Sequence, residues 1–181
     1  MTEETTLVLQ LQNAATKEVA FRNLISQYKE RLYWHIRKIV IIHDDTDDVL
    51  QNTFIKVFRN IDNFKGDSKL YSWMYRIATN EAITFLNKRA KQQNIDIADY
   101  KQQVVSNLKS DDWFSGDEIQ LILQKAIASL PQKQQLVFNM KYFDDMKYNE
   151  IAEVLDTSVG ALKASYFHAV KKIESFIKNY N

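Results

Sequence analysis

One helix-length stretch near the end of the chain carries two sets of side chains with different chemistry. Its apolar residues recur close to every 3.6 positions, which predicts a buried face; they are Val159, Leu162, Tyr166, Ala169, Val170, Ile173, Phe176 and Ile177. Ser158 stands at the start of the stretch, and the opposite face carries Ala161, Lys163, Ala164, Ser165, His168 and Lys171. Such a face suits the major groove of DNA, where lysines meet phosphates and short side chains reach base edges. We therefore expect duplex binding there, with His168 facing DNA or solvent rather than a metal.

A second group of residues, between positions 64 and 91, interleaves aromatic side chains with basic and amide ones. The aromatic members are Phe64, Tyr71, Trp73, Tyr75 and Phe85. The polar members are Lys65, Lys69, Arg76, Asn80, Asn87, Lys88, Arg89 and Lys91. Aromatic rings offer unpaired bases a stacking surface worth about 1–3 kcal/mol each, and lysine and arginine hold phosphates. The alternative is an amphipathic helix whose aromatic side chains form core; we adopt it for Trp73, favour it for Phe85 and leave it open for the others.

A turn lies inside this second group. The sequence Lys65–Gly66–Asp67–Ser68 is typical of a turn, and Asp67 or Ser68 is placed to cap the helix that follows. Because a non-helical turn exposes backbone groups and side-chain acceptors, we expect it to form the wall of a pocket for an extruded, unpaired base. The backbone of the single strand would lie against three cations, Arg76, Lys88 and Arg89. Its bases would stack on whichever of Tyr71, Tyr75 and Phe85 are exposed.

An acidic cluster, His43–Asp44–Asp45–Thr46–Asp47–Asp48, has three interpretations. Carboxylates at the start of a helix gain about 0.3–1 kcal/mol each from the helix dipole. A His–Asp pair also occurs in all-α metal-dependent phosphohydrolases, with His35 as a further candidate ligand, whereas a calcium loop fails for want of the required glycine. The third interpretation is a protein-docking surface made of Asp44, Asp45, Asp47, Asp48, Gln51 and Phe54. The sequence does not distinguish capping from docking, and the two are compatible. We expect His35 to lie on a helix surface.

The apolar spacing predicts the helices that must position these residues. We expect helices over residues 16–41, from just after Asp44–Asp45 to about 61, over about 70–89 and over 119–129, and a new helix after Leu130–Pro131. A polar break then precedes a helix-turn-helix, formed by a helix over 148–155 and a longer one from Ser158. Between residues 94 and 116 the periodicity fades, which predicts a flexible linker, although Trp113 and Phe114 are apolar enough to dock.

Composition limits the class of protein. The 181 residues fit one ordinary domain or two small ones, and three glycines with one proline leave little turn chemistry for strands, so we expect an all-α fold. The absence of cysteine excludes disulfides and thiolate metal sites. No apolar run reaches the length of a membrane span, and the acidic start is unlike a signal peptide. An acidic stretch over 94–118 separates two mildly basic blocks, which suggests two modules that face nucleic acid.

Four stretches, taken in order, resemble the bacterial sigma factors of the extracytoplasmic-function (ECF) group. Residues 44–54 resemble the family's acidic helix start that docks on the polymerase clamp, and residues 64–80 resemble its promoter-melting and minus-ten segment. Residues 129–138 resemble the opening of its fourth domain, and residues 148–171 resemble its minus-thirty-five helix-turn-helix. The chain departs from the pattern at Ala161–Leu162–Lys163–Ala164–Ser165, where members often carry a threonine and an extra arginine.

The resemblance implies two small helical domains joined by a flexible linker: a second sigma domain over 1–93, an acidic linker over 94–116 and a fourth sigma domain over 117–181. It implies a promoter-specificity subunit without enzymatic activity or cofactor. Its partners would be core RNA polymerase, promoter DNA in duplex and single-stranded form, and an anti-sigma factor, in the cytoplasm and without membrane insertion. A stand-alone helix-turn-helix regulator is the main alternative, and the metal-dependent phosphohydrolase is a more distant one.

Overall fold

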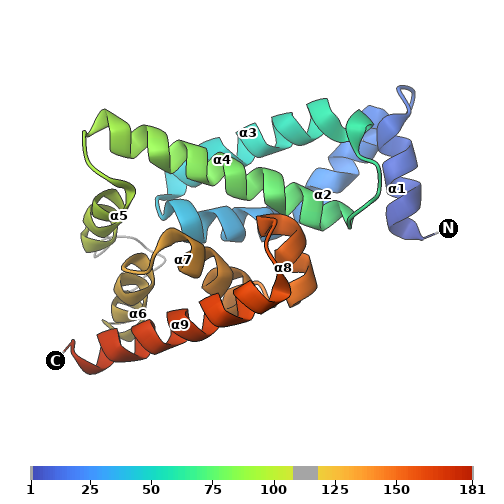
Figure 1. Cartoon of the computed structure of the whole chain (residues 1–181). Coiled ribbons are helices and arrows are strands. Elements are labelled where there is room, and N and C mark those ends of the chain that lie inside the picture. Colours follow the sequence, from blue (N-terminus) through green and yellow to red (C-terminus); the bar gives the residue numbers. More distant parts are fainter. Residues whose placement is uncertain (1, 108–117, 181) are drawn as a thin grey trace. The chain divides into compact units, whose positions relative to one another are not determined.

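The computed structural model describes residues 2–107 and 118–180, and every regular element within them is a helix (Figure 1). The expected all-α fold is confirmed. None of these helices combines the length and the apolar composition that crossing a bilayer requires. The chain forms two compact units, one of residues 1–83 with the short piece 153–155, the other of residues 84–152 and 156–181.

The first unit is built from long helices that meet along their apolar faces. Its elements are α1 (Glu3–Gln12), α2 (Lys17–Val40), α3 (His43–Asn60), the short 3-10 turn η1 (Ile61–Asn63) and the part of α4 (Leu70–Gln92) up to Ile83. Buried core residues include Leu24, Leu32, Ile36, Val57 and Met74. The predictions for α2 and α4 are confirmed to within a few residues. Helix α3 begins earlier than predicted, at His43, so its first aspartates lie inside the first turn.

Helix α1 was not predicted from the sequence. Its less exposed apolar residues, Leu7, Val8 and Leu11, follow helical spacing over little more than one turn, whereas Leu9 is 54% exposed. A cap begins the helix, because the Thr2 side chain accepts a hydrogen bond from the Thr5 backbone N–H at 3.2 Å. A ten-residue helix is marginal by itself in water. Its stability therefore depends on contacts with the rest of the unit.

The second unit is organised around α9. It contains the end of α4, α5 (Ile97–Ser106), α6 (Glu118–Ala128), α7 (Gln132–Phe138), the π-helical turn η4 (Asn139–Phe143), most of α8 (Tyr148–Leu155) and α9 (Val159–Lys178). Its main apolar cluster joins α6, α7 and α9 and consists of Ala126, Ile127, Leu130, Phe138, Ala169 and Ile173. Pro131 directly precedes α7, where its missing N–H costs nothing. Helix α8 begins and ends at the predicted residues.

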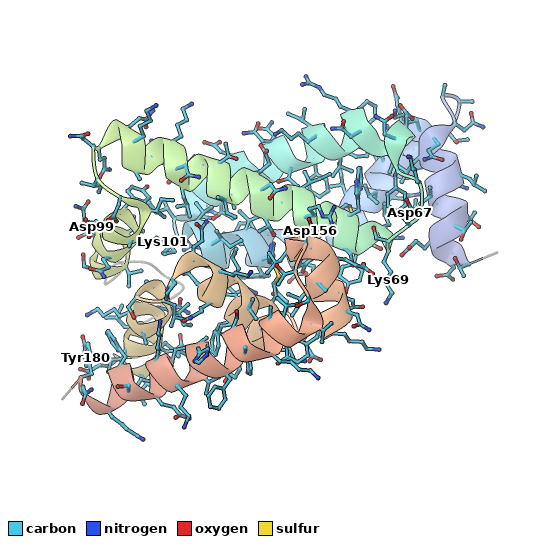
Figure 2. The ribbon with its side chains drawn as sticks, in the orientation of Figure 1. Asp67, Lys69, Asp99, Lys101, Asp156 and Tyr180 are labelled. Atoms are coloured by element: carbon cyan, nitrogen blue, oxygen red, sulfur yellow. The ribbon has the colours of Figure 1, made fainter. Side chains whose placement is uncertain are left out.

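Helix α5 corrects the prediction of a flexible linker over 94–116, because residues 97–106 are helical and packed. Asp96 caps this helix by accepting from the Asp99 N–H at 2.8 Å, and Tyr100, Lys101 and Val105 are buried. Lys101, labelled in Figure 2, donates through Nζ to the Gln135 side chain of α7, and burial lowers its pKa to about 8. Ile97, Tyr100 and Val104 follow helical spacing, and this was the signal that sequence reasoning missed. Trp113 and Phe114 lie outside the described residues.

Candidate nucleic-acid interface

The helix-turn-helix turns sharply between α8 and α9. Asp156, labelled in Figure 2, ends α8 in the left-handed conformation with φ 49° and ψ 54°. The Thr157 N–H then donates to the Ala152 carbonyl at 3.3 Å. The side chain of Ser158 caps α9 by accepting from the Ala161 N–H at 3.3 Å. These local bonds satisfy backbone groups that the break between the helices would otherwise leave open, so the turn fixes where α9 begins.

The two predicted faces of α9 are confirmed as a buried and an exposed face. Leu162, Ala169 and Ile173 are buried, although Ile177, at the end of the predicted stripe, is 43% exposed. The candidate DNA residues of the other face are exposed, except for Ser165, which is half-buried; the exposed ones are Ser158, Ala161, Lys163, Ala164, His168 and Lys171. The helix thus presents small and cationic side chains to solvent over an apolar base. Contact of these residues with DNA stays a prediction.

Phe167 belongs to this exposed face and was missed by sequence reasoning. Its side chain is 58% exposed, and its ring lies 5.8 Å from the His168 ring between centroids. The Lys171 Nζ lies 5.6 Å from the Phe167 ring centroid. An apolar residue is easily assigned to the core, yet Phe167 follows Ala164 by three residues and precedes Lys171 by four. That spacing places all three on one helix face and was the available signal.

The predicted turn of the second group is confirmed. Gly66 adopts φ 78° in the connection between η1 and α4, a conformation that L side chains rarely adopt. Lys65, Asp67 and Lys69 are exposed and Ser68 is half-buried; Figure 2 labels Asp67 and Lys69 on this connection. The residue before α4 is Lys69, so neither Asp67 nor Ser68 occupies the predicted N-cap position. The prediction that one of these two residues is the N-cap of α4 is therefore wrong.

The aromatic residues of the second group divide between core and surface. Phe64 is 8% exposed, and its ring lies 5.2 Å from that of Trp73, which is half-buried and so less deeply placed than we expected. Tyr71 is half-buried, with the Arg31 guanidinium 4.9 Å from its ring centroid. Phe85 is also half-buried, with the Arg89 guanidinium at 5.0 Å. Tyr71, Trp73 and Phe85 are therefore the partly exposed rings of this group, and Tyr71 and Phe85 each have a cation beside them.

Two expectations about the interior of the first unit are wrong. Tyr75 is fully buried and cannot stack on a base, and His35 is 1% exposed rather than on a helix surface. Their rings pack at 4.4 Å between centroids, and the His35 Nε2 shares a hydrogen bond with the Thr79 hydroxyl at 2.8 Å. The hydrogen bond shared with Thr79 satisfies one ring nitrogen, as the burial of a polar side chain requires. The sequence gives no signal for this pairing, since Thr79 lies 44 residues further along.

The polar residues of α4 are mostly exposed, although the Arg76 guanidinium donates from Nε to the Glu153 carbonyl at 3.0 Å and also from Nη2. Arg76, Asn80, Asn87 and Lys88 are exposed, while Arg89 is half-buried beside Phe85. The first three follow spacings of four and seven residues, which places them along one face of the helix. The helix therefore carries amides and cations in a row, as the single-strand prediction requires.

The acidic cluster occupies the first turns of α3. Asp44, Asp47, Asp48 and Gln51 are exposed, whereas Asp45 and Phe54 are each 8% exposed. Those two side chains are therefore poor candidates for a docking contact. A position four residues beyond Gln51 supplies a replacement that sequence reasoning missed, because Ile55 is 41% exposed. Residues 44, 48, 51 and 55 follow helical spacing and form one exposed stripe, which we call the α3 stripe.

The histidine of this cluster has protein partners. The His43 Nδ1 lies 2.6 Å from the Tyr33 hydroxyl, and its Nε2 lies 3.7 Å from the Asp47 carboxylate. Among the described residues, no group of three or more histidine, cysteine, aspartate or glutamate side chains is placed to hold a metal ion. His35, the other ligand that the phosphohydrolase interpretation requires, is buried against Tyr75. The geometry gives that interpretation no support.

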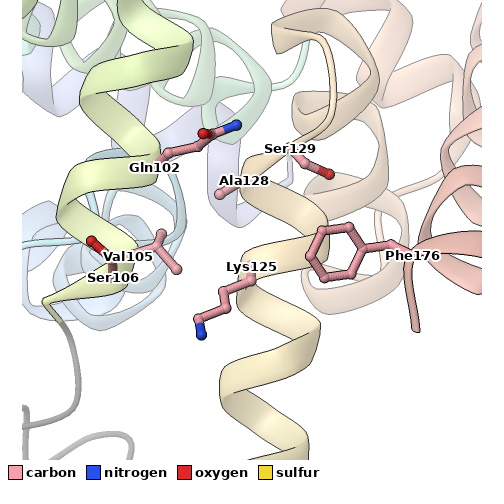
Figure 3. A pocket seen from close by; sticks show the side chains of 7 residues that line it. All are labelled: Gln102, Val105, Ser106, Lys125, Ala128, Ser129 and Phe176. Carbon is pink, nitrogen blue, oxygen red and sulfur yellow. The ribbon is translucent and has the colours of Figure 1, made fainter. Parts of the chain in front are cut away.

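A pocket of about 240 Å³ lies between α5, α6 and α9 of the second unit (Figure 3). Its described lining consists of Gln102, Val105, Ser106, Lys125, Ala128, Ser129 and Phe176. The Lys125 ammonium donates to the Tyr180 hydroxyl at 2.7 Å. No carboxylate or histidine among these lining residues could activate the serine hydroxyls, so they do not form a nucleophilic site.

Two family descriptions match the chain and cover the candidate surfaces. "Sigma-70 region 2" matches residues 24–92, which include the acidic cluster and all of the second group. "Sigma-70, region 4" matches residues 120–173, which include the helix-turn-helix and the exposed face of α9. The matched segments follow each other in the order that the sequence predicted.

Curated relatives and solved structures each match most of the chain. The ECF RNA polymerase sigma-E factor of Haemophilus influenzae is 28% identical over 170 residues, 88% of each chain. That of Escherichia coli K12 is 29% identical over 169 residues, 88% of this chain and 87% of the relative. CnrH, solved with the cytosolic domain of CnrY, has a TM-score of 0.71 and 20% identity over 97% of both chains. RpoE of Bartonella quintana, solved with the anti-sigma factor NepR, has a TM-score of 0.67 and 18% identity over 89% of this chain and 98% of that one. These two structures support the fold alone.

Proposed function

Because the chain belongs to the ECF group of RNA polymerase sigma factors, we propose that three of its surfaces divide the work of promoter recognition. As a member of this family it directs RNA polymerase to promoters, and it is not an enzyme. The surfaces are the exposed face of α9, the connection before α4 with the polar side of that helix, and the α3 stripe. The observation that carries the proposal is the exposed face of α9, small and cationic over a buried apolar base.

The exposed face of α9 reads the duplex at the minus-thirty-five element. Lys163 and Lys171 bind phosphates, which fix the position of the helix but carry little sequence information. Base edges are left to the small and polar side chains, Ala161, Ala164, Ser165 and His168. Phe167 joins them because an exposed phenyl ring can contact the methyl group of thymine, a feature that distinguishes it in the major groove.

The connection before α4 receives an unpaired base of the minus-ten element. The wall of the pocket is formed by Lys65, Gly66, Asp67 and Ser68. The positive φ of Gly66 keeps this part of the backbone out of a helical conformation. Bases stack on Tyr71 and Phe85, the partly exposed rings that have a cation beside them. Single-strand phosphates lie along Arg76, Lys88 and Arg89, with Asn80 and Asn87 able to reach base edges. Binding an unpaired base offsets part of the cost of opening the duplex.

The α3 stripe docks on core RNA polymerase. Its acidic end, Asp44 and Asp48 with Asp47 beside them, attracts a basic partner surface. Its exposed Ile55 supplies apolar area next to the charges, which suits the centre of a protein interface better than carboxylates do. The first-turn aspartates also favour the helix dipole, so capping and docking are compatible.

Partners and location follow from the same proposal. The chain assembles with core polymerase, acts on promoter DNA in the cytoplasm and is held inactive by an anti-sigma factor. The complexes of CnrH with CnrY and of RpoE with the anti-sigma factor NepR support the last partner. We further propose domains over 1–93 and 117–181, with the segment between them carrying α5.

The decisive experiment is a pull-down of core polymerase with the full chain, followed by run-off transcription from a library of promoter fragments. We expect co-purification and transcripts that depend on both proteins. Binding to duplex DNA without any effect on polymerase would instead indicate a stand-alone helix-turn-helix regulator. A metal-dependent phosphatase activity would indicate the more distant alternative.

A further inference from the structure

Helix α1 is bonded to the start of the connection that precedes α4. The side-chain amide of Gln12 donates from Nε2 to two backbone carbonyls, that of Ile61 at 3.0 Å and that of Phe64 at 2.9 Å. These carbonyls are separated by 49 and 52 residues from Gln12 in the sequence. Figure 1 shows the connection running beside α1. One side chain therefore spans the 3-10 turn η1 and holds its carbonyls at fixed positions.

The same helix is bonded to the other end of the connection. The Glu4 Oε1 accepts a hydrogen bond from the Leu70 backbone N–H, the first residue of α4, at 3.1 Å. A carboxylate is favourable there because the N-terminus of a helix carries unsatisfied N–H groups and a partial positive charge. Glu4 supplies this contact from 66 residues away. Lys17, at the start of α2, adds an ion pair to Asp62 in η1 at 2.8 Å.

The residues between these two anchors are mostly exposed. Lys65, Gly66 and Asp67 are exposed. Gly66 has a positive φ of 78°, and glycine can adopt more backbone conformations than any other residue. A connection of this kind would sample many shapes if only its helical ends were fixed. Anchoring each end to α1 limits those shapes without covering the exposed turn. A base pocket needs this, because positioned groups must be held close to their binding geometry before the ligand arrives.

We propose that α1 is a positioning element for promoter opening, in which Gln12 and Glu4 hold the two ends of the connection so that its turn is presented to the unpaired base. The inference rests on the proposed role of that turn. Gln12 and Glu4 are positioning residues, since they touch the connection and not the DNA. Their loss should affect duplex opening and base preference, and leave docking on polymerase unchanged.

The test uses the full chain with core polymerase on a promoter that supports run-off transcription. Gln12→Glu keeps the shape of the side chain, removes both donors and turns a carboxylate toward two carbonyl oxygens. Its matched control is Gln10→Glu, which adds the same charge near the end of α1 at an exposed position. Glu4→Ala removes the acceptor at Leu70, with Glu3→Ala as the control that removes an equal charge from the first turn of α1.

Opening is measured by permanganate reactivity of unpaired thymines on the duplex promoter and on the same promoter with a pre-melted bubble. Losing two hydrogen bonds should slow opening of the duplex about tenfold in Gln12→Glu, and losing one should slow it about threefold in Glu4→Ala. Both should recover on the bubble, while the controls stay near wild type on both templates. In the same two variants, the difference in opening between the four bases at the extruded position should become smaller. A general loss of stability would not produce this change.

A rescue variant separates positioning from folding. Gln12→Lys restores a donor group to the two carbonyls, so it should open the duplex better than Gln12→Glu at equal thermal stability. If Gln12→Glu does not fold, Glu4→Ala and Gln12→Lys carry the test. Opening by Gln12→Glu and Glu4→Ala equal to their controls would overturn the inference, provided that replacing Lys65, Asp67 and Ser68 by alanine abolishes opening. Normal opening by that triple variant would instead overturn the proposed role of the turn.

Discussion

The two proposed DNA-binding surfaces of this protein differ in how much of their geometry is local. The exposed face of α9 is set by the helix itself, since a Ser158 cap begins it and a buried stripe of Leu162, Ala169 and Ile173 turns it outward. The connection before α4 has no repeating backbone, and its ends are bonded to residues of α1. A surface of the first kind tolerates change elsewhere in the chain. A surface of the second kind depends on residues far from it in the sequence.

Each unit also contains a short helix that was not predicted from the sequence, and the two differ in their role. Helix α1 is bonded to a candidate DNA surface, whereas α5 packs through Lys101 against Gln135 of α7. Changes at α1 should therefore alter promoter opening, and changes at α5 should alter stability alone. The following predictions test this contrast, from the largest expected effect to the smallest.

Replacing Lys65, Asp67 and Ser68 together by alanine should reduce opening of a duplex promoter by roughly 100-fold, because unpairing a base costs a few kcal/mol that the pocket no longer offsets. Closed-complex binding should change little, since phosphate contacts supply most of that affinity. Permanganate footprinting on duplex and pre-melted promoters measures the effect. If the triple variant opens the duplex as well as the wild type does, the turn has no role in opening, and the proposed difference between the two surfaces is wrong.

Changing Asp47 and Asp48 to lysine should weaken binding to core polymerase by about tenfold at moderate salt, mainly through a slower association rate. Both side chains are exposed, so the fold should tolerate the change. Biolayer interferometry at several salt concentrations measures the rates, and Arg59→Glu on the same helix controls for a change in charge. If both variants bind polymerase as the wild type does, the acidic turn acts only on the helix dipole.

Lys101→Met should stabilise the protein by about 1 kcal/mol at pH 7, since burying a charged ammonium beside one amide is costly and an isosteric apolar side chain is not. Burial lowers the pKa of Lys101 to about 8, so the unfolded chain holds a proton that the folded chain releases. Wild-type stability should therefore rise from about pH 8 toward 10.5, the ordinary pKa, and fall as the pH drops through 8. Urea unfolding across this range should show the rise in wild type and a smaller one in Lys101→Met. A change in sequence preference in this variant would contradict the assignment of α5 to stability.

Lys163→Ala should weaken duplex binding by a factor of a few for every sequence and lower the salt slope by about 0.9, the value for one lost phosphate contact. His168→Ala and Phe167→Leu should shift sequence preference with little change in slope, because neither neutralises a phosphate. Competition binding to a randomised duplex library at several salt concentrations separates the two effects. A preference change in Lys163→Ala with an unchanged slope would reverse the roles given to these residues.

The apolar periodicity of the sequence was enough to predict those helices whose buried face is long and regular. The apolar stripe of α9, the ends of α8 and the spans of α2 and α4 could be predicted because buried positions recur every 3.6 residues. The turn at Gly66 was also predictable, since only glycine adopts that conformation without strain. The order of the four family-like stretches fixed the kind of protein.

Tertiary structure decided which side chains reach solvent when a pattern permits both outcomes. Tyr75 and His35 are buried because they pack on each other and Thr79 satisfies the histidine nitrogen, while Phe167 is exposed because it lies opposite the α9 core. The short helices α1 and α5 exist because distant residues complete them, Ile61, Phe64 and Leu70 for the first and Gln135 for the second. Local spacing reports which faces of a helix can be buried, but a hydrogen bond across 50 residues leaves no trace in that spacing.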